Sequence, residues 1–142
     1  MSRIRHQRVV ANMPCWLLGH PSDTSGKEIQ STWQFSTVNP YAVQVTFHVN
    51  SGPVTWLFAR ELLDDGCTST SGLADVQISP THHGEYGYVA QLRLSSPSGR
   101  AMLLLPIAAI EDFLHRTYSV VPSGMESRHL QLDKWLSNVL SA

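Results

Sequence analysis

The sequence is poor in charge and in lysine, which limits the ligands that it can attract. Only 15% of its 142 residues are charged, and the net charge is −1. Basic residues gather once, near the N-terminus, at Arg3, Arg5, His6 and Arg8. Such a cluster is typical of a solvated terminal tail, whereas nucleic-acid phosphates require several clustered Lys and Arg side chains. The composition therefore disfavours a nucleic-acid partner.

Cysteine is scarce and long apolar runs are missing. The two cysteines, Cys15 and Cys67, lie far apart and lack the spacing of a metal site. A cytoplasmic protein keeps such thiols reduced, so we expect two buried thiols. No apolar run approaches the ~20 residues needed to span a bilayer, and no cleavable apolar segment follows the basic N-terminus. We therefore expect a cytoplasmic protein without membrane insertion.

Motifs for catalysis and cofactor binding are also missing. No GxSxG, P-loop or GxGxxG pattern occurs, and the seven histidines form no HxxxH or HxH pair for zinc. His82 and His83 are adjacent and are expected in an exposed loop. Asp64 and Asp65 end a short helix, where a solvated terminus is the simplest interpretation. We expect no enzyme activity, cofactor, metal or small-molecule substrate, and a Ser–His–Asp hydrolase is the weakest alternative.

The densest apolar segment, residues 39–66, predicts a β-hairpin followed by a helical turn. Apolar and polar residues alternate from 42 to 50, the period of a half-buried strand, and the turn residues Asn50-Ser51-Gly52-Pro53 follow. The return strand, 54–59, is apolar on both faces, which predicts an inner strand with a layer packed behind it. Residues 60–65 favour helix, with Gly66 as its C′ glycine.

The remaining chain predicts five more strands and two more helices. The strands are expected at 9–18, 31–37, 76–79, 88–95 and 100–105. Pro14 predicts an edge strand or a bulge, Pro80 is expected to end 76–79, and the Ser/Thr/Gly-rich segment 67–74 predicts a mobile loop. The helices are expected from Pro106 to about Tyr118 and at about 132–140. The first has its apolar stripe at Ile107, Ile110, Phe113, Leu114 and Thr117.

Seven strands followed by two C-terminal helices predict a single α+β domain over residues 1–142, with a mostly antiparallel, twisted, barrel-like sheet. Its aromatic residues are interpreted as core rather than as base-stacking platforms. They are Trp33, Phe35, Phe47, Trp56 and Phe58. Open sheet edges must be covered or paired, and pairing between subunits would do this. We therefore expect a homo-oligomer.

Several blocks resemble the SsgA-like proteins of actinomycetes, small regulators of sporulation-specific cell division. PYAV at 40–43, TFH at 46–48 and WLFARELL at 56–63 carry the resemblance. Asn39 and Glu61 stand where the usual pattern has Asp. Later blocks keep the family's order: Asp75-Val76 before Pro80, LSSP at 94–97 with Gly99, Phe113-Leu114 with Arg116-Thr117, and Val121-Pro122 with Gly124 and Glu126. The match covers Asn39 to the C-terminus and is weakest up to Val38.

The resemblance implies a Whirly-like fold, a trimer and a non-enzymatic function at the division septum. It implies an adaptor that recruits the tubulin-like division protein FtsZ to septum sites and promotes its assembly, although family members differ in their division tasks. The partner surface is hypothesised at the helical turn and on the last helix, at Arg60, Glu61, Asp64, Asp65 and Lys134. A single-stranded nucleic-acid-binding protein of Whirly-like fold is the alternative.

Overall fold

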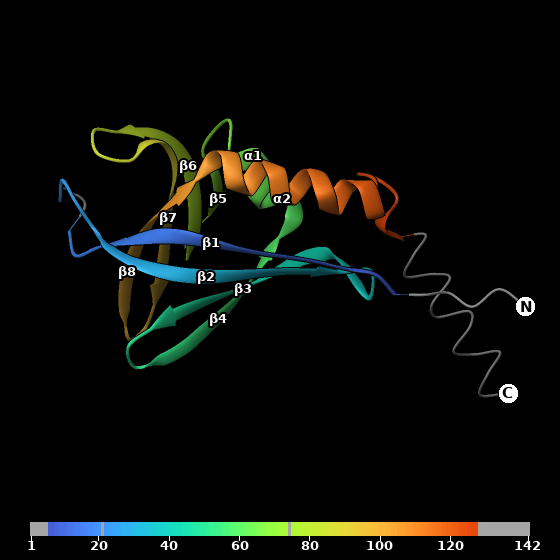
Figure 1. Cartoon of the computed structure of the whole chain (residues 1–142), viewed down its shortest axis with the longest axis horizontal. Helices are drawn as coiled ribbons and strands as arrows, with labels where there is room; N and C mark the ends of the chain where they lie inside the picture. The colour runs from blue at the N-terminus through green and yellow to red at the C-terminus, as the bar shows by residue number, and fades with distance from the viewer. Residues whose placement is uncertain (1–5, 21, 74, 128–142) are drawn as a thin grey trace, which may run out of the picture.

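The computed structural model describes residues 6–20, 22–73 and 75–127 (Figure 1). Eight strands form one antiparallel sheet in the order β4-β3-β2-β1-β8-β7-β6-β5. The strands are β1 (Arg8–Leu18), β2 (Lys27–Ser36), β3 (Asn39–Val49), β4 (Gly52–Ala59), β5 (Ser71–Leu73), β6 (Val76–His83), β7 (Gly87–Ser96) and β8 (Gly99–Pro106). The helices are α1 (Arg60–Gly66) and α2 (Ile107–Val120). This confirms an α+β fold with a curled antiparallel sheet, but with eight strands instead of seven.

The sheet consists of two meanders joined by a short pairing. Strands β1–β4 pair in chain order, and so do β5–β8. The meanders meet where residues 16–18 of β1 pair with residues 102–104 of β8, and we call this pairing the seam. In Figure 1, β1 and β2 run lengthwise below α2, whereas β7 and β8 rise at one end of the molecule. The curled sheet is therefore an open half-barrel, and the Whirly-like arrangement stays a prediction.

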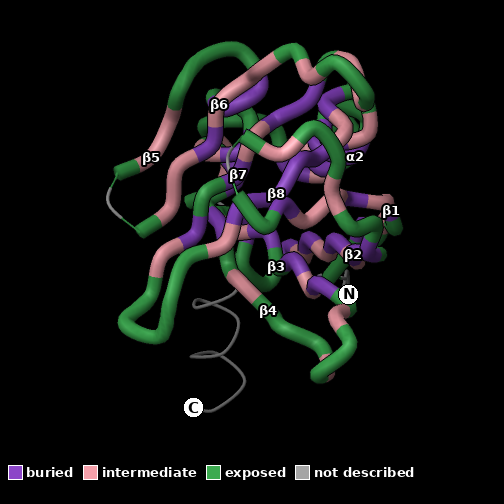
Figure 2. The backbone as a smooth tube through the Cα atoms, turned by 90° about the vertical axis from the view of Figure 1, so that its left-hand side faces the viewer, coloured by how far each residue is buried: buried purple, intermediate pink, exposed green. Residues whose placement is uncertain are grey.

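The main core lies on the inner face of the curl, under α2. The buried residues of α2 are those of the predicted stripe, Ile107, Ile110, Phe113, Leu114 and Thr117. Four of the five aromatics predicted as core are buried, and Trp56 is partly buried against them. A smaller cluster on the outer face covers the seam, with Leu18, Val89, Met102 and Leu104 packed against Trp16 and Tyr86. The buried stretches run through the middle of the sheet in Figure 2.

Strand β4 is an edge strand, and the predicted inner position was wrong. It pairs with β3 alone, and its outward residue Leu57 is 63% exposed. Strand β8 has the same two-faced apolar pattern, yet it lies between β1 and β7 with both faces covered. The two strands have the same pattern of apolar residues, because this pattern depends on side-chain chemistry alone and not on what packs against the strand. Among the described residues, the outer cluster covers β8 but not β4.

Pro14 and Pro80, which were expected to disturb their strands, lie where the strand has a single neighbour. Strand β1 is central and its register with β2 is continuous, contrary to the edge strand or bulge predicted from Pro14. Strand β8 pairs only with residues 16–18 of β1. Strand β6 continues through Pro80 to His83 rather than ending there. Its outer neighbour β5 lies within the predicted loop 67–74 and reaches only Val76–Ile78 in the register. Neither proline therefore faces a second strand that needs its missing N–H.

Gly66 is the last residue of α1 and not a C′ glycine in the left-handed region. Residue Cys67 caps the helix instead, with αR backbone angles. A Cβ on Gly66 would overlap the side chain of Ile78 on β6. The glycine is therefore required for the close approach of α1 to the sheet, and not for backbone conformation.

Candidate functional site

Arg60 begins α1, and its side chain points into the protein. The residue is 2% exposed, although it was predicted on a partner-binding surface. Its guanidinium lies between two rings, with Cζ 4.9 Å from the Phe35 centroid and 4.2 Å from the Tyr118 centroid. Cation–π contacts of this kind strengthen when water is excluded. Arg60 therefore connects α1 to β2 and α2 from inside the core.

The same guanidinium fixes the chain where it leaves α2. Its Nη1 donates to the carbonyl oxygens of Val121, at 2.7 Å, and Thr117, at 3.3 Å. Its Nη2 donates to Oε1 of Glu126 at 2.8 Å, in an ion pair with the carboxylate. Thr117 lies in the last turn of α2, where its carbonyl also accepts from the Val121 backbone N–H at 2.9 Å, and Val121 is the C-cap residue of the helix. Arg60 thus adds a side-chain donor to the backbone cap of α2 and binds the Val121 carbonyl just beyond the helix.

A pocket of about 320 Å³ lies beside this ion pair, at the junction of α1, β3 and the segment after α2. We call it the α1 pocket. It is lined by Tyr41, Ala59, Arg60, Glu61, Tyr118, Ser123, Gly124 and Glu126. Tyr41 and Glu61 are exposed at its mouth. Because Arg60 and its partners fix the walls from below, the pocket is preorganised for a ligand or a partner side chain.

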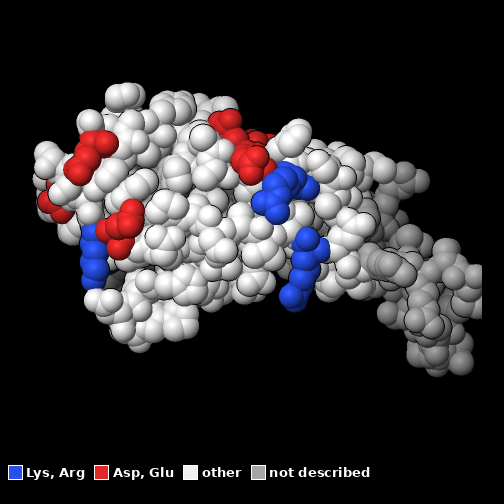
Figure 3. Space-filling view, in the orientation of Figure 1, with Lys and Arg blue, Asp and Glu red and all other residues white. Residues whose placement is uncertain are grey.

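The rim of the α1 pocket is acidic. Glu61 lines the pocket, and Asp64 and Asp65 are exposed on the next turn of α1; we call these three residues the acidic rim. Figure 3 shows acidic side chains at the upper edge of the molecule and a second group at its left end. The Tyr118 hydroxyl donates to Oδ2 of Asp64 at 3.1 Å. Partial burial and the nearby Asp64 charge raise the pKa of Tyr118 to about 12. The hydroxyl therefore stays protonated at neutral pH and keeps Asp64 in place.

The structure separates the predicted partner-binding residues into three groups. Arg60 supports the site from inside, Glu61, Asp64 and Asp65 form its exposed rim, and Lys134 lies outside the described residues. Sequence reasoning missed Tyr41 and Tyr118, which line the pocket from β3 and α2. Tyr41 stands in the PYAV block, so the block that identifies the family also contains a pocket residue. Whether the rim binds a partner stays a prediction.

The Arg60–Glu126 pair predicts a loss of stability in acid. Burial alone would raise the pKa of Glu126, but hydrogen bonds from backbone N–H groups and from Arg60 outweigh it and hold the pKa below its usual value. A carboxylate whose pKa is lower in the folded state than in the unfolded state stabilises the fold at pH values above its unfolded-state pKa. This contribution is lost as the pH falls through its folded-state pKa. We expect Glu126→Gln to lower stability at pH 7 and to reduce the loss on acidification. Urea denaturation of both proteins at neutral and acidic pH measures this, and parallel losses would contradict it.

The described residues offer little for catalysis. They contain no group of three or more His, Cys, Asp and Glu side chains that could hold a metal ion. Cys15 and Cys67 are buried free thiols, as predicted, and burial raises the pKa of each to about 12. A thiol with so high a pKa is a poor nucleophile at neutral pH. None of the helices described is long and apolar enough to cross a membrane.

Comparison with known proteins gives consistent matches across most of the chain. The family model described as "Streptomyces sporulation and cell division protein, SsgA" matches residues 29–126. The sporulation-specific cell division protein SsgB of Streptomyces coelicolor is 40% identical over 121 residues, covering 84% of this chain and 88% of that protein. SsgB of Thermobifida fusca is 42% identical over 108 residues, covering 75% of this chain and 78% of that protein.

Two solved structures share the fold. One, described under "Mutations in SsgB correlate to longitudinal cell division during sporulation of Streptomyces coelicolor", has a TM-score of 0.82 at 35% identity and covers 90% of this chain and 99% of that chain. An SsgA-like sporulation-specific cell division protein from Thermobifida fusca has a TM-score of 0.84 at 33% identity and covers 97% of this chain and 98% of that chain. This chain therefore belongs to the SsgA family of sporulation and cell division proteins.

Proposed function

We propose that this protein acts in sporulation-specific cell division as a non-enzymatic adaptor, which recruits FtsZ to the cytoplasmic face of the septum and promotes its assembly. The names of its relatives support the role in sporulation and division. The observation that carries the adaptor role is the preorganised α1 pocket with its acidic rim, Glu61, Asp64 and Asp65. This surface suits contact with a protein better than chemistry on a substrate, because its exposed charges are all of one sign.

The physical mechanism is mass action. A protein that binds protofilaments more tightly than free FtsZ shifts the equilibrium towards the polymer. An oligomer adds avidity, because several copies of the α1 pocket can engage one filament. Among the described residues, the sheet has two edges without a further strand, β4 and β5, which carry the exposed residues Leu57 and Leu73. Pairing of such edges between subunits would cover them, and we propose a homo-oligomer, with a trimer as the first expectation.

Charge reversal on the rim tests the proposal. We expect Glu61→Lys combined with Asp65→Lys to weaken FtsZ binding in pull-downs by roughly tenfold, at about 1 kcal/mol or less per exposed charge contact. The same variant should also lower FtsZ light scattering. Asp64 is left intact because it holds Tyr118. The matched control is Glu28→Lys with Glu85→Lys, which reverses two exposed acidic residues away from α1.

Two results would contradict this proposal. If the wild-type protein neither binds FtsZ nor changes its polymerisation, the FtsZ adaptor role fails. If the rim variant and the control bind equally well, the role stands but the α1 pocket is not the contact surface. A gel shift with single-stranded oligonucleotide at low salt tests the nucleic-acid alternative. Burial of Trp33, Phe35, Phe47 and Phe58 disfavours that alternative, because base stacking requires exposed rings.

A further inference from the structure

A second pocket, of about 430 Å³, opens on the outer face of the sheet beside the seam. We call it the arginine pocket. It is lined by Leu18, Gly19, His20, Gln77, Arg93, Leu94, Ser95, Arg100, Ala101 and Met102. The strand register places Gln77, Arg93, Met102 and Leu18 in one row across β6, β7, β8 and β1. The α1 pocket lies on the other side of the sheet, so the arginine pocket is a separate site.

The register brings two arginines together in this pocket. Arg93 lies opposite Met102, and Arg100 lies opposite Ser95. The two arginines are thus diagonal neighbours on one face, about 7–8 Å apart at the backbone and within mutual reach of their long side chains. Two like charges at such positions repel each other unless an anion lies between them. None of the residues that line the pocket carries a carboxylate.

Neighbouring polar groups orient the donors of the pocket. With its amide oxygen facing Arg93, Gln91 accepts from Nε at 3.0 Å and from Nη2 at 3.1 Å. Gln91 thus holds the guanidinium with a neutral acceptor, and the nearest carboxylate in the register, Asp75 opposite Ser95, is not among the residues that line the pocket. On the opposite wall, Nδ1 of His20 accepts from the Ser22 backbone N–H at 3.2 Å. The proton of a neutral His20 ring is therefore on Nε2, which makes the ring a hydrogen-bond donor.

We propose that the arginine pocket binds an acidic peptide segment of a partner protein. Two guanidinium groups match carboxylates in charge and in planar geometry, and Leu18, Ala101 and Met102 supply an apolar wall for an aliphatic side chain. The volume exceeds what a single carboxylate or phosphate needs. A nucleotide is the poorer match because no Phe, Tyr or Trp lines the pocket, so the small His20 ring is the one aromatic surface among the lining residues on which a base could stack. This site is independent of the acidic rim proposed for FtsZ.

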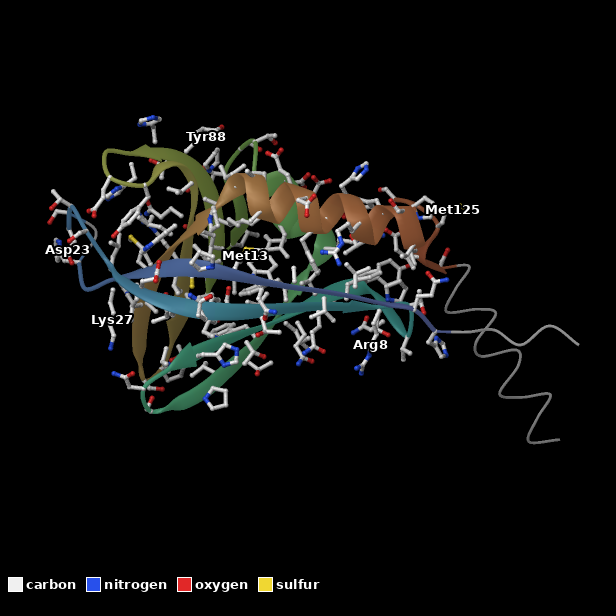
Figure 4. All side chains as sticks on the ribbon, in the orientation of Figure 1. Arg8, Met13, Asp23, Lys27, Tyr88 and Met125 are labelled. Carbon is white, nitrogen blue, oxygen red and sulfur yellow. The ribbon has the colours of Figure 1, made fainter. Side chains whose placement is uncertain are left out.

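Fluorescence anisotropy with a short labelled peptide of Asp, Glu and Leu tests the site. We expect binding that weakens when NaCl rises from about 0.05 M to about 0.3 M, because added salt screens exposed charges. We expect Arg93→Gln and Arg100→Gln each to weaken binding about fivefold, and the double variant about 25-fold, at about 1 kcal/mol per charge contact. Arg8→Gln is the matched control, because this exposed arginine lies at the other end of β1 from the Asp23 turn (Figure 4).

A second variant tests the pocket without removing an arginine. Gln77 is the cross-strand partner of Arg93, so Gln77→Glu places a carboxylate of nearly the same shape inside the pocket. We expect this variant to retain or raise its midpoint of thermal unfolding and to bind the peptide at least about fivefold more weakly, because an internal anion competes for Arg93.

Three outcomes would overturn the proposal. The first is the absence of binding by the wild-type protein at low salt. The second is that a neutral control peptide, in which Asn and Gln replace Asp and Glu, binds as tightly as the acidic peptide, or that the pocket variants bind the acidic peptide as tightly as Arg8→Gln does. The third is tighter binding of a single-stranded oligonucleotide that is lost in the same variants, which would assign the pocket to nucleic acid. Folding of every variant is verified by its thermal unfolding midpoint.

Discussion

Replacing Arg60 with methionine is expected to lower the free energy of unfolding by about 2–4 kcal/mol, because the Val121 carbonyl loses the donor that the buried guanidinium supplies and charge-assisted hydrogen bonds are lost with it. The loss combines several contacts. The Val121 carbonyl loses its donor, and the Thr117 carbonyl keeps only the Val121 N–H. Glu126 loses its counter-ion, and Phe35 and Tyr118 lose the cation between them. Methionine fills much of the volume of the arginine side chain, so the measured loss of unfolding free energy reflects the lost polar contacts more than a cavity. Urea denaturation followed by circular dichroism gives the value.

Arg60→Lys separates charge from geometry. Lysine keeps the positive charge but lacks the planar fork that serves two carbonyls and a carboxylate together, so we expect a loss between wild type and Arg60→Met. Arg116→Met is the matched control. It removes an exposed arginine of α2 that makes one hydrogen bond, 3.1 Å to the Val10 carbonyl, and should change stability by less than about 1 kcal/mol. A loss below this limit for Arg60→Met would show that the buried guanidinium does not stabilise the fold.

Trp33→Ala is expected to be comparably damaging, with a loss of about 3–5 kcal/mol from the cavity left behind. Trp33 is fully buried at the centre of β2, and its ring meets that of Phe113 edge-on, at 5.8 Å between centroids. Its indole N–H donates to Ser31 Oγ at 2.9 Å, and the Ser31 hydroxyl donates to the Met13 carbonyl at 2.8 Å. The substitution therefore disrupts both the packing of α2 on the sheet and a buried chain of hydrogen bonds.

The comparison for this prediction is Trp56→Ala on the edge strand. Trp56 is partly exposed and stacks on Phe58 at 6.2 Å between centroids, so its removal leaves a site that water can fill. We expect a clearly smaller loss of unfolding free energy than for Trp33→Ala, measured in the same denaturation series. Equal losses for the two tryptophans would contradict the assignment of Trp33 to the centre of the core.

The periodicity of apolar residues was sufficient to predict the elements in which one face is buried along the whole length. Strand β3 alternates in burial as its sequence alternates, and the stripe of α2 is buried as predicted. The prediction failed where a remote segment decides the environment. Strand β4 is apolar on both faces but lacks a described cover, and β5 is too short to leave a pattern of its own.

The same reason explains what was missed at the candidate site. An arginine at the start of a short helix is normally exposed, and nothing around position 60 indicates burial. The groups that bury Arg60 are Phe35 on β2, Tyr118 on α2 and Glu126 beyond it. They approach only after the chain has folded. The exposure of Glu61, Asp64 and Asp65 on the same helix, by contrast, agrees with their chemistry alone.

The seam has a consequence for the order in which this protein folds. Each meander consists of hairpins between neighbouring segments, which close small loops quickly. The seam joins residues 16–18 to residues 102–104, so its closure must wait for most of the chain and carries the largest loop entropy. Because it contains only three residue pairs, it yields little enthalpy until Trp16, Tyr86 and α2 have packed over it. The two meanders are therefore expected to form first, and the cooperativity of the whole domain depends on this last short junction.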